Sequence, residues 1–408
     1  MIAIPQLSNS FWESHPALDH IRLSAWESKI NPASPDAVLG VCLCRVAAMI
    51  SPETRLPNDG SLNYLVALVA PSGSGKTTSK RLATKLIPDI GTDLDSFGVG
   101  SGEGLIESYL RTEKDADGNN AKVQRHTSAF FYVDEAESFL NSTKRDSSTT
   151  LGTLRSMWSG GDVGVRNAKM ETTRHLKDGS YRFSCAMGFQ PDYAIQLIRD
   201  DAAGTPQRFL FVSALDIHSP LVSLPSLYPF NVAPPQQGMV HVDSEIQRLM
   251  GERRRRALKN EIEVNHLDSH RDLLHLKTAY LLSVLCGSTD GVTMQWWTIA
   301  RELVDVSASI RSLMLDLGQQ QETDERIAKV NNRIETDEIL DERRNHRIAR
   351  NLGRYALKHG PSPAEKLISK LAGRDRNYAD IDDAIRRGYL VAGNAANQYK
   401  AGPKASTE

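Results

Sequence analysis

The sequence has little cysteine and no long apolar run. Its 408 residues include 4 cysteines, scattered in apolar surroundings. The Cys42-x-Cys44 spacing does not suit a CxxC redox or zinc pair, so we expect reduced core cysteines of a cytoplasmic protein. No window of about 18 uncharged apolar residues occurs, which predicts no membrane span. The start of the chain also lacks the basic and apolar regions of a secretory signal.

The sequence also lacks an excess of charge of either sign. The 49 Lys and Arg residues offset 50 Asp and Glu residues, and the formal net charge is −1. That total at first argues against a nucleic-acid partner, but the charges are unevenly distributed. Residues 321–342 contain eight acids and three basic residues, whereas residues 343–377 contain ten basic residues and two acids. The total therefore says little against DNA, and the local distribution favours it.

Hydrophobic patterning divides the chain into four regions. Residues 1–60 are predicted to be a helical domain, and residues 61–240 alternate short apolar strands with helices. Residues 241–342 are predicted to be a helical extension that ends in a charged helix, and residues 343–408 a small separate domain. Apolar strands that alternate with helices are typical of an α/β domain with a mainly parallel sheet. The strands are expected at 65–69, 129–133, 181–187 and 209–212.

A phosphate-binding loop motif lies between the first expected strand and a helix, with alanine in place of its first glycine. Gly73 and Gly75 let backbone N–H groups face phosphate oxygens without a Cβ in the way. Lys76 supplies charge to the β- and γ-phosphates, and the Thr77 hydroxyl is a ligand for Mg²⁺. We therefore predict ATP and Mg²⁺ as cofactors. The expected nucleotide-binding residues are Ala70, Pro71, Ser72, Gly73, Ser74, Gly75, Lys76, Thr77 and Thr78.

Two acids follow the second expected strand. Asp134 is predicted to hold Mg²⁺ together with Thr77, directly or through water. Glu135 is predicted to orient and activate the attacking water. An ordinary strand end that carries Asp-Glu is the alternative, and the phosphate-binding loop upstream makes it the weaker one. Glu135 favours a hydrolase over a kinase or a nucleotide-dependent switch.

Two further polar residues are placed by the strands that follow. In additional-strand P-loop ATPases, a polar residue at the tip of the strand beside the Asp-Glu strand contacts the γ-phosphate or the water. Gln190 fits this sensor role, and a solvated strand end is the alternative. Arg208 precedes the last core strand, where an arginine can reach a neighbour's nucleotide as an arginine finger. A surface arginine is the alternative there, and Arg199 is the competing candidate.

A basic segment separates the acids from the sensor. Residues 158–182 mix turn residues, short alternating stretches and basic side chains. We predict a hairpin that projects from the sheet and contacts DNA phosphates, with a solvated hairpin as the alternative. The expected DNA-binding residues are Arg166, Lys169, Arg174, His175 and Lys177.

These motifs together resemble a known group of proteins. Ser-Gly-Gly-Asp-Val at 159–163, Arg-Asn-Ala-Lys at 166–169, Gly-Phe-Gln-Pro-Asp at 188–192 and Pro-Gln-Arg-Phe-Leu-Phe at 206–211 look like P-loop ATPases of bacterial mobile elements and phages. Such ATPases are often joined to, or encoded beside, primase-polymerases. The motif order also resembles the superfamily 3 helicases, which are related to AAA+ ATPases. The resemblance covers roughly residues 10–310, and Ser-Leu-Asn at 61–63 also fits it.

The resemblance implies a ring-forming, hexameric, ATP-dependent DNA helicase that unwinds DNA during the replication of a phage or mobile element. It implies that the hairpin contacts single-stranded DNA and that an arginine acts in trans. Ala70 replaces the first loop glycine, and Gln190 stands where superfamily 3 members usually carry Asn. No primase motif occurs in this chain, so priming would require a separate primase or polymerase.

The last region predicts a winged helix. Three helices, Arg347 to His359, residues 363–371 and Tyr378 to Arg387, precede a two-stranded wing. Such a module places its third helix in the major groove. That helix carries Asp380 and two further acids, which is poor for groove reading, and the basic residues lie mostly on the first two helices. Contact with duplex DNA and docking to a protein both remain open.

Other functions are compatible with the same ATP residues. An AAA+ replication initiator or helicase loader would hydrolyse ATP without unwinding DNA. A signalling or defence ATPase would use the nucleotide state as a switch. A second basic cluster, Arg253 to Arg256, is as easily a solvated helix end as a DNA contact. His266, His270 and His275 have no cysteine near them that would complete a zinc site.

Overall fold

The computed structural model describes residues 3–27, 32–92, 94–114, 118–143, 149–165, 167, 172–199, 203–219 and 229–406. The chain divides into two compact units, Met1–Gly318 and Gln319–Glu408. Within the described ranges, no helix combines the length and the apolar character that a membrane crossing requires.

A five-stranded sheet forms the centre of the first unit, and its neighbouring strands all pair in parallel. Across the sheet the order is β2-β5-β8-β1-β9. Every residue of β1, β8 and β9 is buried, as expected of strands covered on both faces. The expected mainly parallel α/β sheet is confirmed. The strands are β1 Tyr64–Val69, β2 Asp95–Phe97, β5 Ser128–Val133, β8 Arg182–Phe189 and β9 Phe209–Ser213.

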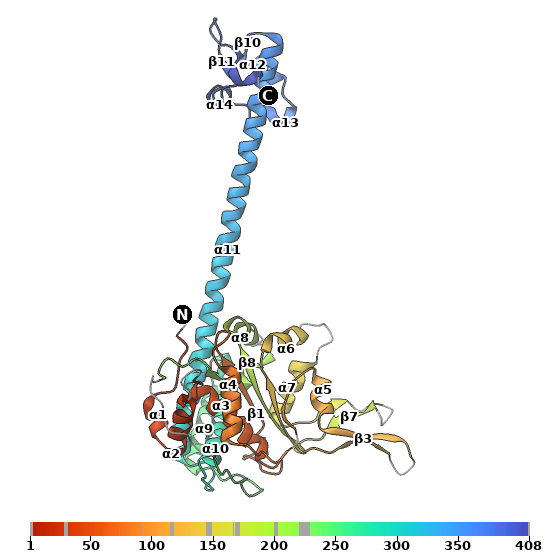
Figure 1. Cartoon of the computed structure of the whole chain (residues 1–408), viewed down its shortest axis with the longest axis vertical. Coiled ribbons are helices and arrows are strands. Elements are labelled where there is room, and N and C mark those ends of the chain that lie inside the picture. Colours follow the sequence, from red (N-terminus) through yellow and green to blue (C-terminus); the bar gives the residue numbers. More distant parts are fainter. Residues whose placement is uncertain are drawn as a thin grey trace. The chain divides into compact units, whose positions relative to one another are not determined.

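Helices from both ends of the first unit share the core of this sheet. Helix α3 contacts β1, β5, β8 and β9, and α2 and α4 pack beside it (Figure 1). Gly40 lets α3 lie close to the sheet, because a Cβ there would come within 2.9 Å of Val66 Cγ1. The region 1–60 therefore shares one hydrophobic core with the strands. The helices before α9 are α1 Asn9–Glu13, α2 Pro16–Trp26, α3 Pro35–Met49, α4 Lys76–Leu86, α5 Gly102–Glu107, α6 Ala136–Thr143, α7 Thr150–Ser159 and α8 Pro191–Ile198.

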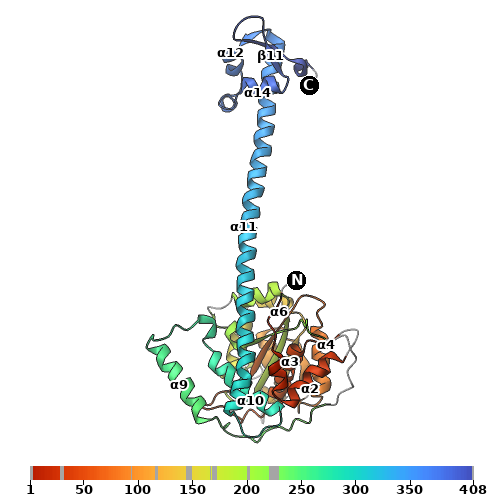
Figure 2. The ribbon, with the colours of Figure 1, turned by 90° about the vertical axis from the view of Figure 1, so that its left-hand side faces the viewer.

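The later helices pack on the same core. Helix α10 (Arg271–Leu285) is buried along most of its length and contacts α3. The first turns of α11 (Met294–His359) reach the sheet, where the Ser307 hydroxyl accepts a hydrogen bond of 2.8 Å from the Phe211 N–H. Helix α9 (Ser244–Leu258) lies at the edge of the unit, and of its residues Ile246 is buried (Figure 2). It carries the second basic cluster, Arg253 to Arg256.

A buried polar network fixes the edge of the sheet where β1 and β8 begin. The Asn63 side-chain carbonyl accepts from the Phe183 N–H at 3.0 Å and from Arg182 Nη1 at 3.3 Å. Its amide donates to Met157 O, and its backbone carbonyl accepts from Lys277 Nζ at 2.9 Å. Asn63, Arg182 and Lys277 are almost fully buried. One asparagine thus ties together β1, β8, α7 and α10.

Burial changes the protonation equilibrium of the two cations of this network. Removal from water lowers the pKa of Arg182 to about 9 and lowers that of Lys277 well below its usual value. Carbonyl groups take the place of water: Arg182 also donates to Ile50 O, Ser51 O and Thr54 O, and Lys277 donates to Trp158 O. The Lys277 ammonium also lies 3.5 Å from the centre of the Trp158 ring.

The second unit has its own small core. After α11 come β10 Ser362–Pro363, α12 Ala364–Ser369, α13 Gly373–Arg376, α14 Ile381–Arg386, β11 Leu390–Ala392 and β12 Gln398–Ala401. The three strands form an antiparallel sheet in the order β10-β12-β11. The expected pair β11 and β12 is confirmed, and β10 is a third strand that the sequence analysis missed. Residues 319–343 of α11 are all exposed, as expected of a charged helix.

The Asn63 network gives a prediction about stability. Asn63→Ala should lower the free energy of unfolding of the first unit by about 3 kcal/mol, because it leaves a buried N–H group and a buried guanidinium short of partners. Urea unfolding followed by circular dichroism measures this change. Asn231→Ala, at an exposed position, should change it by less than about 0.5 kcal/mol. Equal effects of the two substitutions would contradict a special role for Asn63.

Candidate functional site at the carboxyl edge of the sheet

The glycine-rich segment forms a loop between the end of β1 and the start of α4. Gly73 and Gly75 have φ angles of +77° and +86°, in the left-handed region that glycine adopts without strain. Gly75 precedes the first residue of α4, where no side chain caps the helix. The N–H groups of its first turn are therefore available to an anion. Ala70 is fully buried and its N–H bonds Phe189 O at 3.0 Å, so a Cβ is accommodated at this position.

Lys76 folds back over the loop that precedes it. Its Nζ donates to Ala70 O at 3.0 Å and to Pro71 O at 2.9 Å. The side chain is half-buried, and removal from water lowers the pKa of its ammonium, although Asp134 and Glu135 act in the opposite sense. The ammonium therefore lies inside the loop and within the field of both acids.

Thr77 and Asp134 meet across the edge of the sheet. The Thr77 hydroxyl donates to Asp134 Oδ1 at 2.8 Å, and the Tyr132 hydroxyl donates to the same oxygen at 3.3 Å. These are hard oxygen donors, and Mg²⁺ typically binds one or two of them together with nucleotide phosphates and water. Within the described residues, no group of three or more His, Cys, Asp or Glu side chains offers a metal site of its own. The donors fit Mg²⁺ that arrives with a nucleotide.

Gly188 is a site residue that the sequence analysis missed. It lies near the end of β8, between the loop that follows β1 and the acids that follow β5. A Cβ there would come within 2.3 Å of Asp134 O and 3.1 Å of Lys76 Cδ. Glycine is therefore required for Lys76 and Asp134 to approach each other. A lone glycine inside an apolar strand is the sequence signal that could have indicated this close approach.

Glu135 and Gln190 lie at the same edge of the sheet. Glu135 is exposed and directly follows Asp134, just before α6 begins. Gln190 follows the last residue of β8 and precedes α8. Because β8 pairs with both β1 and β5, Gln190 lies between the phosphate-binding loop and the acids. The structure thus brings the loop, Asp134, Glu135 and Gln190 to one edge, as the sequence analysis expected.

Arg208 lies at the other edge of the sheet. It directly precedes β9, whose first residue pairs with Leu65 near the start of β1. Its guanidinium lies 5.6 Å from the centre of the Trp158 ring and donates to Gly204 O. Burial, and then the charge of Arg155, lower the pKa of Arg208. A strand of this length spans about 17 Å, so Arg208 is remote from the phosphate-binding loop of its own chain.

Arg199, the competing arginine, is exposed at the end of α8. Its Nη2 donates to Gly318 O at 3.3 Å. Helix α8 starts at the edge that carries Gln190 and has 8 residues, which corresponds to about 12 Å. Arg199 is thus bonded to α11, and Arg208 lies at the far edge of the sheet.

The basic segment forms the expected hairpin. Strands β6 (Val163–Val165) and β7 (Arg174–Leu176) are antiparallel, with Val165 opposite Arg174. Lys177 is exposed, whereas Arg174 bonds Glu107 at 2.8 Å and His175 lies 3.2 Å from Asp162. The other two expected DNA contacts, Arg166 and Lys169, lie outside the described residues.

A second hairpin, which the sequence analysis missed, lies beside the first. Strands β3 (Leu110–Lys114) and β4 (Asn120–Gln124) project on the same side of the unit as β7 (Figure 1). Glu107 joins the two hairpins, because it accepts from both Lys122 and Arg174. Burial alone would raise the pKa of Glu107, but these hydrogen bonds outweigh it and lower the pKa. Arg111 is exposed on this second hairpin. The Asp-Gly pair at 117–118 was the available hairpin signal.

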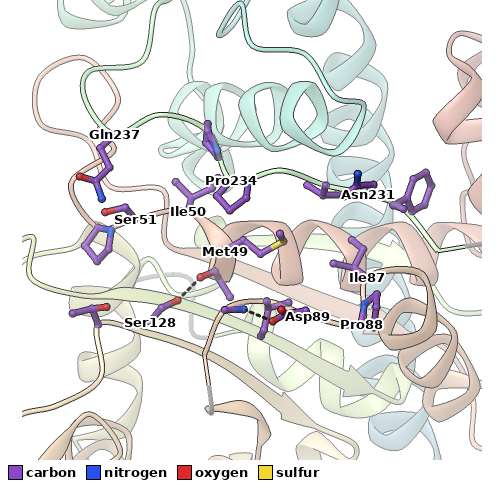
Figure 3. Close-up of a pocket in the computed structure, with 18 residues that line it drawn as sticks. Met49, Ile50, Ser51, Ile87, Pro88, Asp89, Ser128, Asn231, Pro234 and Gln237 are labelled. Atoms are coloured by element: carbon purple, nitrogen blue, oxygen red, sulfur yellow. Dashed lines mark hydrogen bonds between the residues drawn. The ribbon is translucent and has the colours of Figure 1, made fainter.

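A cavity of about 650 Å³ lies away from this site (Figure 3). Its walls come from the end of α3, the segment after α4, the start of β5 and the proline-rich residues 230–237. The Ser128 hydroxyl donates to Ala48 O across it, and the Gly91 N–H donates to Asp89 Oδ1. Because β5 begins here, the cavity belongs to the edge of the sheet opposite the phosphate-binding loop.

No protein-family model matches the chain, and no curated protein matches it. The fold defines the chain as an α/β protein with a parallel central sheet.

Gly188 gives a prediction that concerns this edge of the sheet. Gly188→Ala should lower the free energy of unfolding by about 1–3 kcal/mol, because the added Cβ overlaps the Asp134 carbonyl and the backbone has to shift. Gly100→Ala is the control, since a Cβ there meets nothing within 4 Å. Urea unfolding of both variants tests the prediction, and a Gly188→Ala protein as stable as the control would contradict it.

Proposed function

We propose that the chain is an ATP-hydrolysing, ring-forming DNA motor, namely the replicative helicase of a phage or mobile element. The observation that carries the proposal is the contact of 2.8 Å between Thr77 and Asp134, with the Lys76 ammonium in the adjoining loop. The insertion of β8 between β1 and β5 supports it. This is the strand arrangement of the additional-strand P-loop ATPases that the sequence resembles, and it places Gln190 between the loop and the acids.

In this proposal each residue at the edge has one task. Thr77 and Asp134 hold Mg²⁺, which, when bound, neutralises charge on the β- and γ-phosphate oxygens. Lys76 exchanges its two loop carbonyls for phosphate oxygens. The N–H groups of the loop and of the first turn of α4 hold the remaining phosphate charge.

The attacking water is positioned from the acid side of the site. Glu135 accepts its proton, and Gln190 orients the water or the γ-phosphate through its amide. Glu135 can take this role because it is exposed beside Asp134, whose carboxylate is already engaged with Thr77.

An arginine from a neighbouring chain would complete the site, which requires an oligomer, in this proposal a hexamer. The sequence analysis selected Arg208 with Arg199 as its competitor. Arg208 is partly buried against Trp158 and donates to Gly204 O, whereas Arg199 is exposed, although it donates to Gly318 O. Exposure therefore favours Arg199 as the group that acts in trans.

The two hairpins would contact single-stranded DNA. Lys177 on the first hairpin and Arg111 on the second are exposed cations on elements that Glu107 joins. Phosphate contacts of this kind bind DNA without regard to its sequence. ATP hydrolysis would move both hairpins together, because the Glu107 contacts connect them.

The first functional prediction concerns Glu135. Glu135→Gln should lower the rate of ATP hydrolysis about 10²–10⁴-fold, since the general base is lost, while ATP binding is retained. Release of phosphate and binding of a fluorescent ATP analogue measure the two properties. Glu137→Gln, which changes an acid on the next helix, is the matched control. A Glu135→Gln protein that hydrolyses ATP at the unaltered rate would overturn the assignment.

The second functional prediction separates a motor from its rivals. Lys177→Ala with Arg111→Ala should abolish stimulation of ATP hydrolysis by single-stranded DNA and should abolish strand displacement, while the basal ATPase rate is unchanged. Lys85→Ala with Arg81→Ala, which removes two exposed charges from α4, should leave stimulation intact. An initiator or loader would hydrolyse ATP without displacing a strand. A signalling switch would not respond to DNA in any variant.

A further inference from the structure

Basic side chains follow one face of the last turns of α11. Arg347, Arg354 and Lys358 are exposed there, spaced by seven and then four residues. This spacing places them on the same face of an α-helix. The row extends about 17 Å along the helix axis.

The turn after α12 brings further basic residues to this face. A hollow of about 310 Å³ is lined by Arg354 and Lys358 from α11 and by Lys370 from the turn. Arg347 donates to Asp375 Oδ1 at 2.9 Å, which brings Arg347 to the same place. Arg374 is exposed beside Asp375. Together these cations form the α11 basic face, which consists of Arg347, Arg354, Lys358, Lys370 and Arg374.

Helix α14 of this unit has the opposite character. Arg387 bonds Glu342 at 2.6 Å and Asp383 at 2.6 Å, and these hydrogen bonds raise its pKa. Arg386 lies 3.4 Å from Asp383 Oδ1. Arg386 in α14 and Arg387 directly after it therefore lie beside carboxylates of the unit, and Asp382 is exposed as well. The carboxylates on this helix would repel DNA phosphates.

We propose that the unit Gln319–Glu408 binds the phosphate backbone of duplex DNA through the α11 basic face and not through α14. A duplex carries one phosphate charge per about 1.7 Å of axis with both strands counted, so a row of cations about 17 Å long can meet several phosphates on the side that faces it. Asp375 is the carboxylate that lines the hollow, and Arg347 already engages it. Binding of this kind is independent of base sequence and strongly dependent on salt.

The proposal rests on the proposed function in one respect, that DNA is the partner of this chain. It names a second DNA-binding surface, for duplex and not for single strands. A motor that engages a single strand at the hairpins would thereby be held beside the duplex that it opens. The nucleotide site has no part in the interaction.

The test compares two variants of the full chain that lose equal charge. Lys358→Ala with Lys370→Ala removes two cations from the α11 basic face. Arg386→Ala with Lys400→Ala removes two from α14 and β12. Fluorescence anisotropy with a labelled duplex, measured over a range of salt concentrations, gives the affinity and the slope of log K against log salt. The first variant should bind duplex more weakly. The magnitude of its negative slope should decrease by about 2, since each lost phosphate contact reduces that magnitude by about 1. The second should retain the slope.

Two kinds of result in the binding measurement would overturn the proposal. A lower slope in the Arg386→Ala, Lys400→Ala variant alone would place DNA on α14 and the strands after it. Equal slopes for the wild type and both variants, or no duplex binding by the wild type, would mean that the face serves a protein partner or none. ATPase activity and its stimulation by single-stranded DNA should be unchanged in both variants. If the wild type lacks these activities but shows the expected slope change, the motor proposal fails and the duplex-binding surface stands.

Discussion

The close approach of Lys76 and Asp134 across strand β8 is the constraint on which the arrangement of the site depends. Strand β8 separates the phosphate-binding loop from the acids, and a side chain at position 188 would keep them apart. Gly188 removes that obstacle, because even one Cβ would overlap the Asp134 carbonyl. The contact between Thr77 and Asp134 is a consequence. One residue without a side chain therefore connects the topology of the sheet to the chemistry proposed at its edge.

Buried hydrogen bonds stabilise the opposite edge of the sheet. There Asn63 and the buried cations Arg182 and Lys277 bind carbonyl groups that would otherwise be left without partners. Removing these groups from water costs free energy, and the hydrogen bonds offset that cost only if every partner is in place. The polar groups at this edge are paired, whereas the carboxyl edge keeps the N–H groups of α4 uncapped and Glu135 exposed.

Local patterns predicted much of this, and tertiary contacts account for the rest. The glycines of the loop, the acids after an apolar strand and the buried strands are local signals, so residues 70–78, Asp134 and the parallel sheet were predictable. The structural role of Gly188 depends on neighbours in two other strands, and that of α3 depends on its packing into the sheet. Strand β2 is short and partly exposed, and β10 has 2 residues, so neither has a periodicity to detect.

The central claim is that chains assemble around DNA so that one completes the nucleotide site of the next. The most direct measurement is the particle mass with a non-hydrolysable ATP analogue and single-stranded DNA, compared with the mass of each component alone. The account predicts a closed oligomer of six chains of 45.1 kDa bound to DNA, formed when both ligands are present. A particle that stays at the mass of one chain with both ligands bound would contradict the arginine in trans and the ring.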